Sequence, residues 1–441
     1  MPRLAYTQRA LLYSLAAIGL GLSAISLEAA EKVLEIRGAV SQALAANLDL
    51  RSAYHEIEMA RGRLIQAGRW PNPELEIDAA TDRAFNNSGE HRLGVAFTQA
   101  FPVTGRLRLA KEVSRVDVAQ ALAEIRDRER LLIAETQHAY VSVVAAGEQL
   151  STIREARSLN ESLVVVSTRR FENAEVSKEE INLAKLQVQA SKKEEQLAVA
   201  TYEAELTKLK LVLGMNAELP LAVQKRLAAL SGVIVSSERV SFRPDLRRLE
   251  LAINRGGSER ELAKAERWED IKVGIGVDSE RRLDEPAGLE TDRAVGIRLS
   301  IPLPLFNRNE GRIAEAEAGM RKAADEYAAK SLTIASEIHL ASKWRDRYTE
   351  ILAEFEKETL PLIGDTAKLL QDAYAQGTAD ISDAIRAQEQ GLELRRSYLE
   401  ALMNRLGAEI DLQSATGSSP HLNSSMLSAR ADANQFKRAD R

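Results

Sequence analysis

The sequence predicts a mainly α-helical protein that also contains four amphipathic β-strands and is built from an internal duplication. Three observations predict this fold class. Leu93, Val95 and Phe97 alternate with smaller or polar residues, which is the period of a strand with one apolar face. Farther along, apolar residues recur every seven positions, which indicates a long packed helix; the series is Val118, Ile125, Leu132, Ala139, Ala146 and Ile153. The third observation is that both patterns occur twice.

The duplication is visible in pattern and in spacing. The segment GVAFTQAFP, which starts at Gly94, corresponds to GIRLSIPLP, which starts at Gly296, at an offset of 202 residues. Moving this series by the same offset reaches Met320, Tyr327, Ile334, Ala341, Tyr348 and Phe355, and Leu362 continues it by one further step of seven; all are apolar or aromatic. A repeat at a fixed offset indicates two copies of one structural unit. We expect these copies to span residues 31–240 and 241–417.

Each repeat is expected to fold as a helix, an antiparallel strand pair, a long helix and a returning helix. In the first repeat these elements are predicted at residues 38–69, 71–103, 105–171 and 175–213. In the second repeat they are predicted at residues 245–268, 271–304, 308–370 and 380–412. Because proline cannot donate to a strand ladder, prolines mark the strand-to-helix joints; the joint residues are Pro102, Gly105, Pro302 and Pro304. In each repeat the two shorter helices are together about as long as the long helix, so they can lie end to end beside it.

Composition favours long helices over large globular cores. Aromatic residues make up only 5% of the chain, whereas apolar residues reach 45% and charged residues 28%. The formal net charge is −5 and no block of basic residues occurs, so no nucleic-acid partner is expected. The chain has no cysteine, which excludes disulfides, thiolate metal sites and a lipid-anchored N-terminal cysteine.

Both ends of the sequence differ from the repeats. Residues 1–30 read as a signal peptide, because two arginines precede an apolar run at 10–27 and small residues follow. The alternative is a membrane anchor, and in either case the chain is expected to leave the cytoplasm. No later segment offers about 18 uninterrupted apolar residues, so no further membrane helix is expected. Residues 418–441 lack any period and are expected to form a mobile polar tail.

The strands are about ten residues long and have one apolar and one polar face. Such strands fit a soluble sandwich or a membrane barrel, but four strands cannot close either structure. A homotrimer would supply twelve strands and leave no edge exposed. We therefore expect a trimeric 12-stranded β-barrel. Its lipid-facing side chains would include Val95, Phe97, Ile297 and Leu299, and Arg298 would face the lumen.

The repeated element order, with Gln99-x-Phe101-Pro102-x-x-Gly105 at the first joint, resembles the TolC-type outer-membrane factor family. Within it, residues 301–309 (IPLPLFNRN), followed by Gly311-x-Ile313-Ala314, are most similar to the CzcC-like exit ducts of heavy-metal efflux systems. The resemblance implies a barrel in the outer membrane that continues as a long α-helical tunnel through the periplasm. It also implies two partners, a periplasmic adaptor and an inner-membrane pump of the resistance-nodulation-division class, with heavy-metal cations as substrate. Channels for drug efflux or type I protein secretion are the alternatives.

The resemblance also identifies candidate residues at the hairpin tips, where residues 171–177 align with 374–380 at an offset of 203. Family members often place Tyr, Gly-Thr and then acidic residues at the second tip, where some relatives carry an Arg and a second Asp that this chain replaces with Ala379 and Arg386. The expected periplasmic aperture residues are Tyr374, Asp380, Asp383, Arg386 and Glu180, which is the first-repeat equivalent of Asp383. The expected adaptor-contacting residues are Ala174, Glu175, Val176, Ser177, Gly377 and Thr378. Ser177 and Asp380 are also expected to be helix N-caps.

No motif predicts an enzyme or a bound cofactor. The five histidines show no H-x-x-H or H-E-x-x-H spacing, and neither a P-loop nor G-x-S-x-G occurs. His138 and His339 occupy nearly equivalent places in the two long helices, so a transient metal contact and simple solvation both remain open. A periplasmic adaptor would not explain the duplication, and a structural coiled-coil protein would not explain two amphipathic strand pairs.

Overall fold

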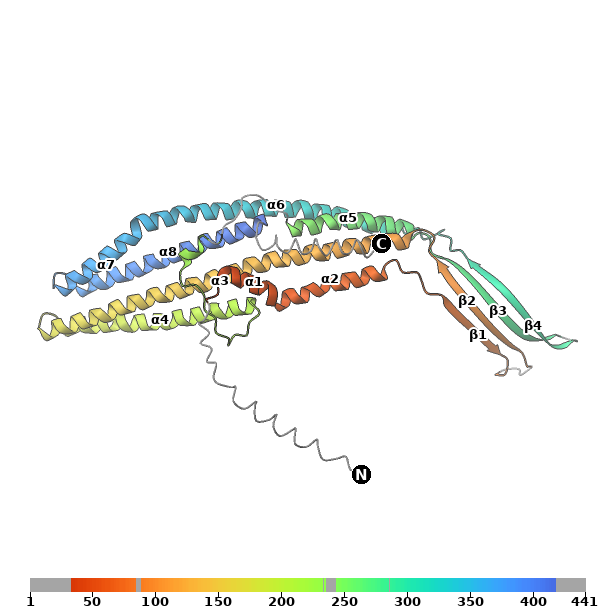
Figure 1. The fold of residues 1–441 in the computed structure, drawn as a ribbon, viewed down its shortest axis with the longest axis horizontal. Helices are drawn as coiled ribbons and strands as arrows, with labels where there is room; N and C mark the ends of the chain where they lie inside the picture. Colours follow the sequence, from red (N-terminus) through yellow and green to blue (C-terminus); the bar gives the residue numbers. More distant parts are fainter. Residues whose placement is uncertain (1–32, 85–88, 233, 235–242, 285, 418–441) are drawn as a thin grey trace, which may run out of the picture.

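The computed structural model describes residues 33–84, 89–232, 234, 243–284 and 286–417. The expected signal peptide and polar tail lie outside these residues. A long bundle of helices carries one four-stranded sheet at its end (Figure 1). This mainly helical architecture with a single sheet confirms the fold class. Among the described residues, no helix combines the length and hydropathy needed to cross a bilayer.

The helices of the first repeat include a break that the sequence analysis missed. They are α1 (Ile36–Ala46), α2 (Leu48–Gln66), α3 (Arg106–Glu172), α4 (Lys178–Val212) and the short η1 (Leu227–Leu230). The single helix expected at 38–69 is wrong because the chain is extended at Asn47, with φ −62° and ψ 124°. The Asn47 side chain accepts a hydrogen bond from the Leu50 backbone N–H at 2.9 Å. Asparagine caps a helix in this way, so it ends α1 and starts α2.

The long helix of the second repeat is also interrupted. The helices here are α5 (Pro244–Ala265), α6 (Glu310–Glu354), α7 (Leu360–Ala375) and α8 (Ile381–Thr416). The continuous helix expected at 308–370 is wrong, because a π-helical segment, Phe355–Thr359, separates α6 from α7. Pro361 lies in the first turn of α7, and proline removes a helical hydrogen bond and crowds the preceding turn. The wider π-turn accommodates this change, and Figure 1 shows the bend there.

The sheet takes one antiparallel strand pair from each repeat. Its strands are β1 (Glu74–Thr81), β2 (His91–Phe101), β3 (Ile271–Asp284) and β4 (Gly288–Ser300), in the order β1-β2-β3-β4. Apolar residues lie opposite one another in rows that cross all four strands. One row is Ile77, Val95, Val277 and Val295, and the next is Leu75, Phe97, Ile275 and Ile297. These side chains are exposed, so the sheet presents one continuous apolar face.

The other face of the sheet is polar and crowded. Arg298 lies on this face, with its Nη1 3.6 Å from Glu76 Oε2, whereas the neighbouring Ile297 and Leu299 lie on the apolar face. Glycine leaves room for the polar side chains here. A Cβ at Gly94 would lie 2.7 Å from Asp278 Oδ1, so the carboxylate would have to move. The register therefore separates the two faces as the alternation predicts.

The helices pair along their length as two sets of rods. α3 packs against α1 and α2 along one half and against α4 along the other, and α6 packs against α5 and α8 in the same manner (Figure 1). The main core lies where the rods meet and includes the fully buried Tyr140, Leu213, Leu227 and Ile410. The Tyr140 hydroxyl donates to the Leu34 carbonyl at 2.7 Å, which ties the start of the described chain to α3.

Candidate functional site

The second hairpin tip contains Tyr374, an expected aperture residue, and the structure places its ring inside the molecule. The ring has no exposed surface. Its hydroxyl lies 2.7 Å from Ser167 Oγ of α3 and donates to Glu180 Oε2 of α4 at 3.4 Å. Burial raises the pKa of the Tyr374 hydroxyl, so it stays protonated near neutral pH. Tyr374 therefore joins the two hairpins of one chain.

Arg170 completes this contact and was missed by the sequence analysis. Its guanidinium carbon lies 4.9 Å from the centre of the Tyr374 ring, and its Nη1 donates to the Tyr374 carbonyl at 3.1 Å. It also forms an ion pair with Glu175 at 3.3 Å. A weak signal existed in the sequence, since Arg170 precedes Phe171, the residue that aligns with Tyr374. A cation in the last turn of a helix is favoured by the helix dipole.

Of the other aperture candidates, Glu180 takes part in this contact, whereas Asp380, Asp383 and Arg386 face away from it. Ile381, Ala384 and Ile385 are buried against the first hairpin, so Asp383 and Arg386 are exposed. Asp380 is also exposed and occupies the N-cap position. Its side chain makes no capping bond, although its carbonyl accepts a hydrogen bond from the Asp383 N–H at 3.1 Å. Ser177 similarly occupies the N-cap position of α4 without a side-chain cap.

The two tips have the same backbone geometry. Ala174 and Gly377 are equivalent by the offset of 203, and both are left-handed, with φ values of 59° and 78°. The next residue donates its N–H five residues back in each tip, from Glu175 to Arg170 at 2.8 Å and from Thr378 to Ala373 at 2.9 Å. The exposed adaptor candidates, together with the half-buried Val176, thus lie on two matching turns.

The expected joint residues lie where the sheet meets the helices. Pro102 follows the last residue of β2, and Pro302 and Pro304 follow the end of β4. Gly105 is the N-terminal cap of α3 and has a φ of 71°, which glycine adopts without strain. Asn309 fills the corresponding left-handed position before α6, with a φ of 59°, and was missed by the sequence analysis.

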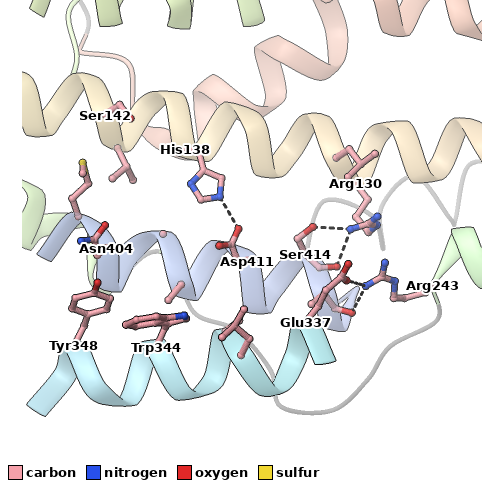
Figure 2. A pocket seen from close by; sticks show the side chains of 18 of the residues that line it. Arg130, His138, Ser142, Arg243, Glu337, Trp344, Tyr348, Asn404, Asp411 and Ser414 are labelled. Carbon is pink, nitrogen blue, oxygen red and sulfur yellow. Dashed lines mark hydrogen bonds and ion pairs between the residues drawn. The ribbon is translucent and has the colours of Figure 1, made fainter. Parts of the chain in front are cut away.

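A cavity of about 750 Å³ lies between α3, α6 and α8 (Figure 2). Trp344 and Tyr348 stack on one wall with ring centroids 5.6 Å apart, and His138 Nε2 lies 2.9 Å from Asp411 Oδ1. His339 is exposed on α6 and does not line this cavity, so the structure does not bring the two candidate histidines together. Within the described ranges, no three His, Asp or Glu residues are grouped to hold a metal ion.

One end of the cavity is a junction at which α8 ends and α5 begins. Arg130 donates to the Ser414 carbonyl at 3.1 Å, and Arg243 donates to the Ala415 carbonyl at 2.8 Å. The positive charges of Arg130 and Arg243 interact favourably with the negative end of the α8 dipole. Arg243 also binds the buried Asp245 at 2.6 Å. Burial alone would raise the pKa of Asp245, but the hydrogen bonds and charge of Arg243 outweigh it and lower this pKa to about 2.

The first repeat builds the equivalent junction without a charge. Asn47 donates through Nδ2 to the Val212 carbonyl at 3.1 Å, and Val212 corresponds to Ala415 by the offset of 203. Both junctions hold a helix end against the start of the next rod. The long wall of the bundle is therefore continuous in both repeats.

Comparison with known proteins identifies the family. A sequence model described as outer membrane efflux protein matches residues 39–215 and 235–418, which together make up most of the chain. The cobalt-zinc-cadmium resistance protein CzcC of Cupriavidus metallidurans is 23% identical over 383 residues, covering 84% of this chain and 86% of CzcC.

Solved structures show the same fold. A CusC structure, whose study concerns folding and transmembrane channel formation, superposes with a TM-score of 0.70 at 18% identity, covering 86% of this chain and 91% of that one. The outer membrane protein VceC of Vibrio cholerae gives 0.66 at 17% identity, with coverages of 87% and 96%. Proteins of this kind are efflux proteins of the outer membrane rather than enzymes. The chain belongs to the outer membrane efflux protein family.

Proposed function

We propose that this protein is the exit duct of a tripartite efflux system and acts as a homotrimer. The observation that carries the proposal is the sheet, which has a continuous apolar face, a polar face with ion pairs, and β1 and β4 at its two edges. Three copies would close these edges into a barrel with lipid outside and water inside. The helices would continue the duct through the periplasm to a resistance-nodulation-division pump and its adaptor.

The internal duplication specifies how neighbouring chains would pair. Ile77 faces Val95 in the first repeat and Ile275 faces Ile297 in the second, so β1 maps onto β3 at an offset of 198 and β2 onto β4 at 202. Within the chain, Phe97 of β2 faces Ile275 of β3. Applying the same offsets, Leu299 of one chain faces Ile77 of the next.

Cysteine cross-linking tests this closure directly, because the natural chain has no cysteine. In one chain β1 and β4 are separated by two strands, or about 14 Å across the sheet, so no bond can form within it. The double variant Leu299→Cys with Ile77→Cys should give covalent species of up to three chains after oxidation in membranes. The control variant Val295→Cys with Ile77→Cys, on the same face but four residues out of register, should not. Absence of linked chains with every pair along these edges would reject the trimer.

For the substrate, we propose heavy-metal cations. The support is the likeness to CzcC, a cobalt-zinc-cadmium resistance protein, over most of both chains. A duct requires no selective ligand cage, so the described residues need no metal cluster for this role. Restoring the gene to a strain that lacks it should raise tolerance to zinc or cadmium, whereas unchanged metal tolerance with raised drug tolerance would contradict the substrate assignment.

A further inference from the structure

Beyond the end of β4, the segment 301–306 exposes large apolar side chains that have no role in the proposed duct. The chain is neither strand nor helix here and lies between Ser300 and the start of α6. Its exposed side chains are Ile301, Leu303, Leu305 and Phe306, and Phe306 is 99% exposed. Exposed apolar groups gathered in this way mark a contact with another apolar surface.

This segment continues the apolar stripe of β4. Val295, Ile297 and Leu299 occupy alternate positions on the apolar face, and residues 301, 303 and 305 keep the same alternation. To cross an apolar band about 25 Å tall, a strand tilted by about 40° needs an apolar stripe about 33 Å long. The part within β4, residues 295–299, extends only about 13 Å and cannot cross the band alone.

Two features of the segment reduce the number of its unpaired backbone donors. An unpaired N–H in hydrocarbon costs several kcal/mol, and this segment has left the sheet. Pro302 and Pro304 have no N–H, and the N–H of Leu305 donates to the Leu303 carbonyl at 2.8 Å. The two prolines therefore remove backbone N–H groups from the segment that follows β4, where no neighbouring strand can accept them. The first repeat differs, since its equivalent of Phe306 is Thr104 by the offset of 202.

The segment is also held in place and followed by a cation. Asn309 donates through Nδ2 to the Ala263 carbonyl of α5 at 2.7 Å, and its N–H donates to Asn307 Oδ1 at 3.0 Å. Arg308, between these asparagines, is exposed, and its carbonyl accepts from Arg267 at 3.3 Å. A basic side chain two residues after an apolar segment matches the change from acyl chains to phosphate at a bilayer surface.

We infer that residues 301–306 form a wedge that inserts into the periplasmic leaflet of the outer membrane. In this arrangement Leu303, Leu305 and Phe306 contact phospholipid acyl chains, and Arg308 contacts headgroup phosphate. The inference rests on the proposed barrel, and it extends the lipid contact below the sheet to the start of the helical duct. It also supplies an attachment at this leaflet in a chain that has no cysteine for a lipid anchor.

Depth-dependent quenching tests the wedge. Single variants Phe306→Cys, Ile297→Cys and Leu332→Cys, each labelled with one fluorophore, are reconstituted in vesicles of phosphatidylethanolamine and phosphatidylglycerol. Leu332 is the matched control because it is 71% exposed on α6, away from the sheet. Brominated acyl chains should remove as large a fraction of the fluorescence at position 306 as at 297, and little at 332. Aqueous iodide should show the reverse order.

Each contrary result has a distinct meaning. Lipid quenching at 297 with iodide quenching at 306 would overturn the wedge and leave the barrel intact. Protection of 306 from both quenchers would show that another copy of the chain covers it, which also overturns the wedge. Failure of lipid quenching at 297 would reject the proposed barrel itself. Since the Phe306 side chain is fully exposed, its replacement leaves the folded chain intact.

Discussion

Arg243 performs in the second repeat the task that Asn47 performs in the first, but with a charge that is 1% exposed and bound to Asp245. Without Arg243, the buried Asp245 would keep its longer ion pair with Lys330, at 3.5 Å, but would lose its hydrogen-bonded partner, which costs about 3 kcal/mol. We expect Arg243→Ala to lower the unfolding free energy by this amount and Asn47→Ala by about 1 kcal/mol. Denaturation in detergent measures both changes, and the exposed Arg247→Ala is the control; equal losses in all three variants would contradict the argument.

The same pair predicts a pH dependence of stability. The pKa of Asp245 is about 2 in the folded chain, below its ordinary value of 3.8. A lowered carboxyl pKa stabilises the fold above pH 3.8, and this stabilisation is lost as the pH falls from about 4 to about 2. The loss amounts to about 2 kcal/mol. Denaturation at several pH values should show a shallower decline for Asp245→Asn, whereas Asp49→Asn, at the exposed first-repeat position, should follow the natural protein.

Single residues also show where sequence reasoning stopped. Tyr374 could be chosen from the sequence because it belongs to a local pattern. Its partners Ser167 and Arg170 could not, because they lie about 200 positions away and become neighbours only when the two hairpins pack. The sequence therefore singled out Tyr374, and the structure shows that it joins the two hairpins; its role at the aperture stays a prediction.

At the scale of elements, periodicity predicted which helices and strands form, and single residues determined where the helices are interrupted. Two interruptions were missed because an apolar period persists through both of them. Asn47 offers a capping side chain in the middle of one period, and Pro361 lacks the N–H that a continuous α-helix needs in the other. The assignment of strand residues to the two faces, in contrast, followed from the alternation, because a slip of one residue would exchange the faces.

The two faces of β4 provide an element-level prediction. Ile297 is 82% exposed on the apolar face, and an arginine near the middle of a bilayer costs about 2–4 kcal/mol per chain. We expect Ile297→Arg to reduce the amount of assembled trimer in outer-membrane fractions strongly, and Ser300→Arg, on the polar face, to reduce it little. Gel mobility of unheated samples measures the trimer. Similar assembly of both variants would reverse or abolish the assignment of faces.

At the scale of the whole molecule, the duplication carries most of the information. Offsets of 198 and 202 relate the strands, and an offset of 203 relates the tips and helix ends. Contacts between the repeats of one chain can therefore serve as a template for contacts between chains. The two repeats differ, however, in the environment of the equivalent acidic residues near the hairpin tips. Glu180 is half-buried and hydrogen-bonded to Tyr374, whereas its second-repeat equivalent, Asp383, is exposed.

This difference predicts which acid controls ion passage. In a trimer whose second tips converge, three exposed Asp383 carboxylates would act on one narrow opening, where low-dielectric walls focus their field and attract cations. We expect Asp383→Ala to lower the cation-to-anion permeability ratio by roughly 2- to 10-fold. Asp383→Arg should reverse the preference or block conduction. Recordings in planar bilayers measure both effects, with Asp365→Ala, an exposed acid farther along the hairpin, as the control.

Because the Glu180 carboxylate is already engaged by Tyr374, Glu180→Gln should change selectivity less than Asp383→Ala. Identical conductance and selectivity in all of these proteins would show that the narrowest charged ring of the duct lies away from Asp383.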